Sequence, residues 1–182
     1  MTDPVNTICE MPRPIKVRPL PADPVVVEAD AAEREALAAR FGLGGIDSLN
    51  AEITLEQKAG AIRASGVLNA AVQQVCAVSN ENFPVTISES FELRFVPEAA
   101  RPAPRDEDEA IEIELEREDL DEIEYSGDTF DLGEAVAQTL GLAIDPYAEG
   151  PNADAARAAA GIGGDDEPRG PLAEALAALK KD

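Results

Sequence analysis

A two-residue alternation of apolar and polar side chains between Val85 and Phe95 constrains the fold most strongly. Glu89 is the one exception to it. The apolar positions are Val85, Ile87, Phe91, Leu93 and Phe95. Successive side chains of a strand point to opposite faces, so this spacing gathers the apolar set on one face. The pattern predicts an antiparallel sheet with one buried and one wet face.

Earlier stretches of the chain fit the same sheet. A short strand is predicted from Pro24 to Val27, and residues 51–57 and 61–76 have an extended, β-branched pattern on either side of a Lys-Ala-Gly turn. Within the second stretch one face carries Leu68, Ala70, Val72 and Cys76. We expect the loop 79–84 to join two of these strands as a hairpin.

Helical signals flank the sheet on both sides in sequence. Asp30 and Glu33 have the spacing of a capping box before a helix from Ala31 to Phe41, which a run of glycines would end. Asp131 and Glu134 have the same spacing before a helix from Leu132 to Ala143. These signals place one helix on each side of the predicted strands in chain order.

The fold class is therefore predicted as α+β, with a curved antiparallel sheet or a small open β-barrel of about five to seven strands, two or three flanking helices and flexible termini. Residues 1–23 are expected to form an extended, basic, Pro-rich arm. Residues 24–147 would form a single α+β domain with an internal acidic linker near 98–110. A flexible linker over 148–170 and a short amphipathic C-terminal helix over 171–182 would follow.

Charge is the strongest feature of the composition. The chain has 37 acidic and 15 basic residues, no His and a formal net charge of −22, and more than half of that charge lies between Asp106 and Asp128. Repulsion from phosphate opposes non-specific nucleic-acid binding, which depends on Lys and Arg. The acids favour a basic partner, or they only keep the surface solvated.

Two candidate contact sets follow from the charges. Residues 111–116 alternate Ile or Leu with Glu, which predicts a strand whose outer face is acidic. The candidate partner-binding residues are Glu112, Glu114, Glu116, Asp119, Asp121, Glu122 and Glu124. The candidate RNA or tail contacts are Arg13, Lys16, Arg18, Lys180 and Lys181.

The residues for chemistry are few, and we predict no catalytic residue, cofactor or metal site. A structural zinc site needs about four N or S ligands, and the chain offers only Cys9 and Cys76. The sequence around Cys76 supplies no base or cation to form a thiolate, so we interpret this residue as a small buried apolar side chain. Paired carboxylates leave a carboxylate-metal hydrolase open as a less favoured alternative.

The location of the protein is expected to be the cytoplasm. The sequence has no apolar run of the length that a membrane-spanning helix requires, and its N-terminus lacks the apolar core of a secretory signal. In that reducing compartment both cysteines would stay thiols. Oligomeric state and strand order do not follow from the sequence.

The order of these pieces resembles the YceD family, the large ribosomal RNA subunit accumulation proteins of bacteria. The resemblance rests on "CAVSNENFPVTISESFELRFVP", the acidic stretch, "FDLGEAVAQTLGLAIDPYAEGPNADA" and the closing "GPLAEALAALKK". Many family members have Cys-x-x-Cys where this chain has Cys76 and Ser79, so a metal role in those relatives does not carry over.

The resemblance implies a non-enzymatic ribosome-biogenesis factor that supports accumulation or processing of large-subunit ribosomal RNA. Charge makes a basic ribosomal protein or assembly factor the preferred partner, bound by the acidic surface, with ribosomal RNA affected indirectly and no membrane involved. Direct RNA binding through the basic tails is the alternative.

Overall fold

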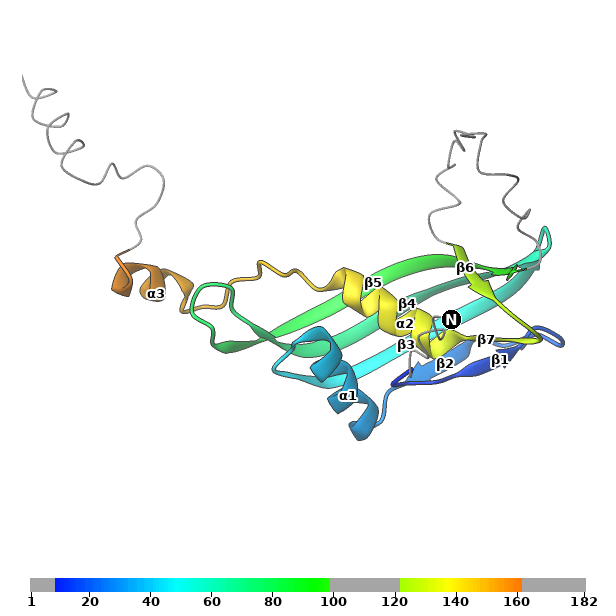
Figure 1. Ribbon diagram of the computed structural model, residues 1–182, viewed down its shortest axis with the longest axis horizontal. Coiled ribbons are helices and arrows are strands. Elements are labelled where there is room, and N and C mark those ends of the chain that lie inside the picture. The colour runs from blue at the N-terminus through cyan, green and yellow to red at the C-terminus, as the bar shows by residue number, and fades with distance from the viewer. Residues whose placement is uncertain (1–8, 99–121, 162–182) are drawn as a thin grey trace, which may run out of the picture. The chain divides into compact units, whose positions relative to one another are not determined.

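The computed structural model describes residues 9–98 and 122–161. Its strands are β1 (Pro14–Lys16), β2 (Val25–Glu28), β3 (Gly45–Lys58), β4 (Ala61–Val75), β5 (Asn82–Pro97), β6 (Glu122–Tyr125) and β7 (Thr129–Asp131). Its helices are α1 (Ala31–Phe41), α2 (Leu132–Ala143) and α3 (Ala153–Ala159). The predicted α+β class is confirmed (Figure 1).

The main sheet is open and has the strand order β2-β3-β4-β5-β6. β2 with β3 and β3 with β4 pair antiparallel, whereas β6 pairs parallel with the end of β5. A second, two-stranded sheet pairs β1 with β7. The described residues divide into a sheet unit, residues 9–74, 84–98 and 122–145, and a loop unit, residues 75–83 and 146–161.

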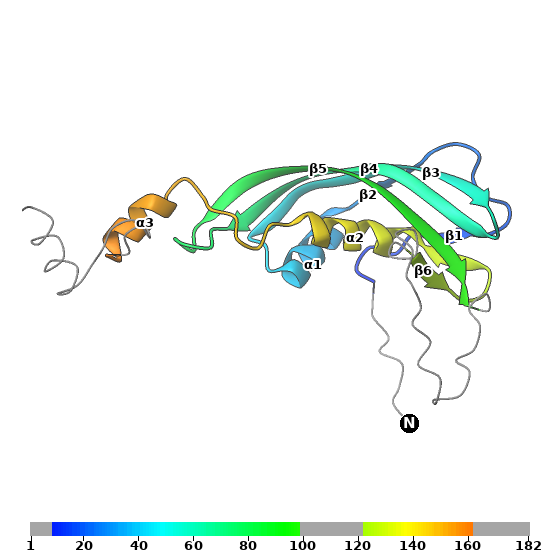
Figure 2. The same ribbon diagram turned by 90° about the horizontal axis from the view of Figure 1, so that it is seen from above.

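The core of the sheet unit lies between the sheet and two helices. Figure 2 shows the sheet as a curved layer, with α1 and α2 on its concave side. The two-residue alternation determines which side chains face the helices, since β3 and β4 bury every second residue over much of their length. The buried set includes Leu49, Ile53, Ile62, Leu68, Leu37, Leu132, Val136 and Leu140.

Helix α1 begins and ends where the sequence predicts. The Asp30 carboxylate accepts from the Glu33 backbone N–H at 2.9 Å, and the Glu33 carboxylate accepts from the Asp30 N–H at 2.8 Å. These two bonds form the expected capping box. The helix ends at Gly42, whose φ of 65° is left-handed and suits glycine.

Helix α2 begins with only half of the predicted capping box. The Asp131 carboxylate accepts from the backbone N–H groups of Gly133 and Glu134. The Glu134 carboxylate does not accept from the Asp131 backbone N–H, because the Arg40 guanidinium binds it through two hydrogen bonds of 2.8 and 2.9 Å. Charge-assisted bidentate bonds are stronger than a bond to a neutral backbone N–H, so they determine the position of this carboxylate.

The N-terminal arm is built into the sheet unit from residue 9 onward. Met11 is completely buried, and Ile15 of β1 pairs with Phe130 of β7. The backbone N–H of Arg13 donates to Asp131 at 2.9 Å. The Pro-rich composition predicts an extended arm but contains no sign of this packing, which depends on residues more than a hundred positions away in sequence.

The loop unit contains a helix where the sequence predicts a flexible linker. α3 spans Ala153–Ala159 and is mostly alanine. Alanine has the highest helix propensity but gives no contrast between an apolar and a polar face, so periodicity misses such a helix. The predicted strand over 111–116, most of the linker over 98–110 and the C-terminal helix over 171–182 lie outside the described residues.

Candidate partner-binding surface

The described part of the predicted acidic surface is the outer face of β6. Glu122 and Glu124 are exposed, while Ile123 and Tyr125 between and beside them pack on the core. Glu122 forms an ion pair with Arg94, the residue of β5 that it pairs with in the sheet, at an N–O distance of 3.0 Å. Glu112, Glu114, Glu116, Asp119 and Asp121 lie outside the described residues, so their role stays a prediction.

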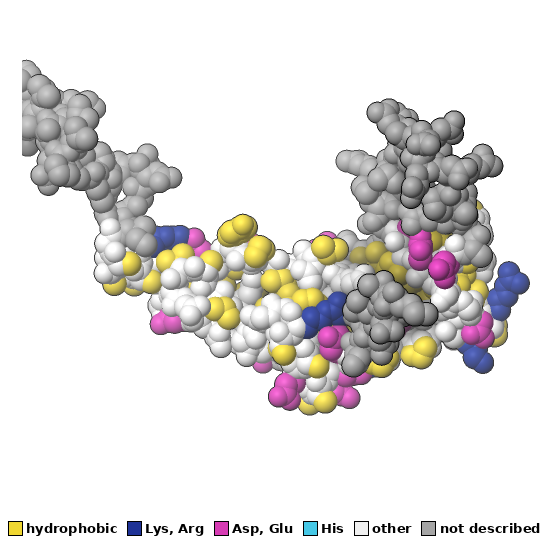
Figure 3. Space-filling view, viewed as in Figure 1, with side chains coloured by type: hydrophobic (Ala, Val, Ile, Leu, Met, Phe, Trp, Pro, Cys, Tyr) yellow, Lys and Arg dark blue, Asp and Glu magenta, His cyan; other side chains and the backbone are white. Residues whose placement is uncertain are grey.

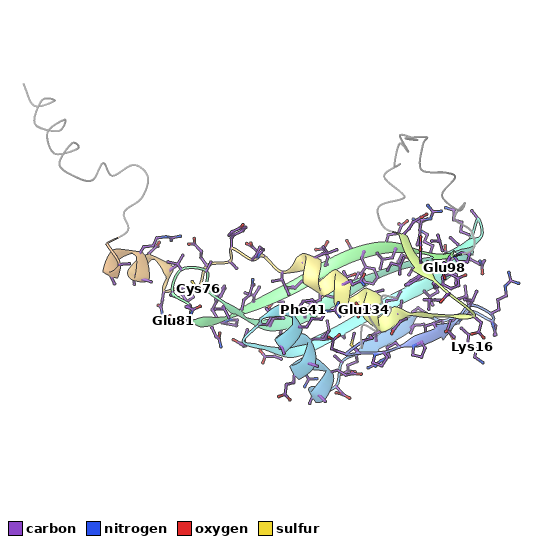
Figure 4. The ribbon with its side chains drawn as sticks, in the orientation of Figure 1. Lys16, Phe41, Cys76, Glu81, Glu98 and Glu134 are labelled. Carbon is purple, nitrogen blue, oxygen red and sulfur yellow. The ribbon has the colours of Figure 1, made fainter. Side chains whose placement is uncertain are left out.

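The predicted basic contacts differ in their surroundings: Arg13 is bonded within the fold, whereas Lys16 and Arg18 are exposed. Arg13 donates to both oxygens of Glu33, at 2.7 and 2.8 Å, and also to the backbone oxygen of Glu28, so its guanidinium is part of the fold. Lys16 and Arg18 are exposed, and neither has an ion pair within residues 9–98 and 122–161. Figure 4 shows Lys16 at one end of the sheet unit. Lys180 and Lys181 are outside the described residues.

Cys76 is buried, as predicted, with 2% of its surface exposed. The surroundings are polar in a way that the sequence did not indicate. Its Sγ accepts from the backbone N–H groups of Val78 and Ser79 at 3.4 and 3.3 Å. Hydrogen bonds from the Ser79 hydroxyl and from these N–H groups lower the pKa of the thiol to about 7. The turn therefore favours a thiolate but gives it little access to a substrate.

Cys9 has the opposite electrostatics. Burial and the nearby carboxylates of Asp131 and Glu134 raise its pKa to about 12. This thiol stays protonated at neutral pH, so it does not supply a nucleophile.

Several carboxylates are held in the charged form by arginine. Arg40 lowers the pKa of Glu134, and Arg13 lowers the pKa of Glu33, in each case chiefly through hydrogen bonds to the carboxylate. A general acid requires the reverse shift. In the part of the chain that the structure describes, no three His, Cys, Asp or Glu side chains gather as metal ligands.

The described residues of the sheet unit form hollows at its surface, among them the following. One, of about 430 Å³, lies between α1 and the start of β3 and includes Arg34, Glu35 and Leu43 in its lining. Another, of about 330 Å³, lies between β5 and the end of α2. Its lining includes Glu89, Phe91, Leu93 and Leu142. Leu142 is 90% exposed, and Figure 3 shows hydrophobic side chains at the surface on the face that carries α2.

Sequence reasoning missed the second hollow. Its one signal was Glu89, the charged exception in the alternating pattern of β5. The two-residue alternation of β5 places Glu89 on the same face as Phe91 and Leu93, so the exception is a carboxylate at the hollow that these apolar side chains line.

These features define a small, acidic α+β protein with an open sheet and surface hollows. The family model described as "Large ribosomal RNA subunit accumulation protein YceD" matches residues 64–181. The chain belongs to the YceD family. No curated protein and no solved structure matches the chain. Among the described residues no helix has the length and hydrophobicity to span a membrane.

Proposed function

We propose that this protein is a non-enzymatic factor that supports accumulation or processing of large-subunit ribosomal RNA by binding a basic protein. The family description supports a role in accumulation of that RNA. The observation that supports binding of a basic protein is the excess of 37 acidic over 15 basic residues in a member of this family. Such a surface attracts Lys- and Arg-rich proteins quickly and in a salt-dependent way.

The structure of β6 supports an outward acidic face. Glu122 and Glu124 point away from the core because they alternate with Ile123 and Tyr125. In the sequence a separate alternation of the same kind occurs at 111–116, where Ile or Leu alternates with Glu112, Glu114 and Glu116. The proposed binding surface consists of these acids together with Asp119 and Asp121.

A binding role also agrees with the state of the ionisable groups. The pKa values of Glu33 and Glu134 are lowered by arginine, and the buried Cys76 has little contact with solvent. Charged, paired carboxylates stabilise a fold or attract cations, whereas proton transfer at neutral pH requires a raised carboxyl pKa.

The test is capture of purified components at low and high salt. The protein should retain basic large-subunit ribosomal proteins at low salt and lose them as salt rises, and the double variant E122K/E124K should retain less. Retention of naked ribosomal RNA without any basic protein would refute the proposal.

Direct RNA binding should be tested with point substitutions in the arm. Truncation of the arm would remove the buried Met11 and β1, and the fold would suffer. Lys16→Ala and Arg18→Ala are better probes, because both side chains are exposed. If they abolish RNA retention on a filter while capture of basic proteins is absent, the protein acts on RNA directly.

A further inference from the structure

In the part of the chain that the structure describes, the outer edge of β5 has a partner strand only at its C-terminal end. β6 pairs only with Arg94–Pro97. Within the described residues, Pro84–Leu93 has β4 on one side and no strand on the other. A free edge presents a row of N–H and C=O groups to which another strand can bond.

Side chains next to this edge form a hollow that is apolar at Phe91, Leu93 and Leu142 and polar elsewhere. Phe91 and Leu93 are partly buried on the inner face of β5, between the buried Ile87 and Phe95. Across the hollow of about 330 Å³ lie Thr139, Leu142 and Ala143 of α2. Leu142 is 90% exposed although it is large and apolar. The hollow therefore offers room for one apolar side chain beside the free edge.

Glu89 adds a carboxylate to this surface. It is exposed, lies on the inner face and lines the hollow. Glu92, the other acid that lines the hollow, pairs with Arg63. Glu89 has no ion pair within the described residues. A carboxylate on a largely apolar face fits a partner that brings one cation among apolar side chains.

We propose that an extended segment of a basic protein adds to β5 as a strand between Pro84 and Leu93. It places an apolar side chain in the hollow beside Leu142 and a Lys or Arg on Glu89. A strand points alternate residues to one side, so an apolar and a basic residue two positions apart reach both places. This inference rests on the proposed function and deepens it, because it names the surface and the mode of binding.

The chain's own acidic segment is the main rival occupant. Counted back from the Arg94–Glu122 pair in parallel register, Arg117 is the residue that would face Glu89. The surplus of carboxylates in that segment disfavours it next to Glu89 and Glu92, whereas a basic segment is attracted. The experiment below distinguishes the two occupants.

The probe is a blocked peptide of about ten residues, long enough to cover the free edge, in which every second residue is in turn Val and Lys, with Thr at the positions between, so that Val and Lys lie on the same face. The full-length protein should bind it, and hydrogen exchange should slow at the amides of residues 84–93. E89K and L142D should each weaken binding by about tenfold. The matched control E35K makes the same charge change at an exposed site on α1 and should weaken it by less than about twofold.

A second peptide carries N-methyl groups at consecutive central positions, which block both of its edges, and keeps every side chain. It should lose binding, because strand addition needs the backbone N–H groups. If it binds equally well, or if E35K weakens binding as much as E89K, the attraction is merely electrostatic and the proposal fails. Circular dichroism verifies that the variants are folded.

Three further outcomes would overturn the proposal. In the first, amide hydrogen exchange at residues 84–93 is already slow in the absence of peptide, and R117E accelerates it. This would show that the chain's own acidic segment occupies the edge. Dimers that the peptide does not dissociate would show a second copy there. If Glu89→Val dimerises and wild type does not bind the peptide, the role of Glu89 is only to prevent edge-to-edge association of two copies.

Capture of basic ribosomal proteins separates this proposal from the one on which it rests. If E89K and L142D lose these proteins and wild type retains them, both proposals stand. If the variants retain them as wild type does, the proposed function stands and the edge is not the site. If wild type itself retains none, the proposed function fails.

Discussion

At the scale of single residues, Arg40 connects three segments of the chain. Its guanidinium donates to Glu134 of α2 and to Glu10 of the N-terminal arm, and it lies 5.3 Å from the ring centroid of Phe41. Figure 4 shows Phe41 and Glu134 in the region where α1 and α2 approach each other. The side chain of Glu134 is only 20% exposed, so this ion pair is less screened than a surface pair.

Replacement of Arg40 should therefore destabilise the fold. Arg40→Met should lower the free energy of unfolding by about 1–3 kcal/mol, because it removes charge-assisted bonds and leaves Glu134 partly buried without its cation. Urea denaturation measures the change. A double-mutant cycle with Glu134→Gln should give a positive coupling energy, and additive effects of the two substitutions would contradict the assignment.

The same pair predicts a pH dependence. Arg40 holds the pKa of Glu134 below 4.5, its ordinary value, so the pair contributes stability that is full above 4.5. That contribution is lost as the pH falls through the lower folded pKa. Wild type should therefore lose more stability on acidification than Arg40→Met does. Equal acid sensitivity of the two proteins in urea titrations would count against this role.

Cys76 should show a pH profile unlike that of an ordinary thiol. Because hydrogen bonds from Ser79 and the backbone lower its pKa to about 7, alkylation by iodoacetamide should level off above that pH. Burial keeps the rate low throughout. Mass spectrometry of the two labelled peptides measures both sites, and labelling of Cys9 should keep increasing, since its pKa is about 12.

Ser79→Ala is the control for this profile. It removes the hydroxyl that contributes most to the lowered pKa of Cys76, so the inflection should move to higher pH. An unchanged inflection would assign the shift to the backbone alone.

At the scale of elements, the start of α2 depends on a close backbone approach. A Cβ on Gly133 would lie 1.8 Å from the backbone oxygen of Met11, a completely buried residue of the arm. Farther along the helix, a Cβ on Gly141 would meet only the ring of Phe41, at 2.8 Å. Backbone cannot move aside as a half-exposed side chain can, so the two glycines differ in their tolerance of a methyl group.

The two Gly→Ala substitutions should thus have different effects. Gly133→Ala should destabilise by at least about 2 kcal/mol, because the arm must leave α2 to make room. Gly141→Ala should lie within about 1 kcal/mol of wild type, since the gain in helix propensity offsets the shift of Phe41. Thermal unfolding measures both. A mild effect of Gly133→Ala would mean that the arm is loosely attached.

Local patterns predict most elements but not how these elements pair. The capping box of Asp30 and Glu33 and the glycine that follows Phe41 determine α1 within a few residues, so its bounds follow from the sequence. β1 could not be predicted, because Ile15 forms a strand only by pairing with Phe130. The parallel pairing of β6 depends equally on distant residues.

The candidate site was less predictable than the fold. Alternation placed Glu122 and Glu124 outward, but Arg13, a candidate RNA or tail contact in the sequence, forms an ion pair with Glu33 in the structure. The hollow beside Leu142 needs α2 and β5 together, and periodicity cannot reveal which helix covers which strand. The sequence shows Glu89 as an exception to the apolar alternation of residues 85–95, but it contains no explanation for that exception.

At the scale of the whole molecule, the net charge of −22 opposes the compact state. The described ion pairs, such as Arg40–Glu134 and Arg13–Glu33, use several of the 15 basic residues and leave the acids in large excess. Repulsion among exposed carboxylates acts over about 10 Å at moderate salt and is screened progressively as salt increases. Salt weakens the surface ion pairs as well. With 37 acidic and 15 basic residues, however, carboxylate–carboxylate repulsions outnumber the ion pairs, so screening favours the folded state.

Added salt should therefore stabilise the protein. Between about 10 mM and about 300 mM NaCl the midpoint of thermal unfolding should rise by several degrees, because the Debye length falls from about 30 Å to below 10 Å. The double variant E122K/E124K, with net charge reduced by four, should unfold at a higher temperature than wild type at low salt and respond less to NaCl. If the midpoint falls with salt instead, the ion pairs outweigh the repulsion, and the acidic surface does not oppose folding.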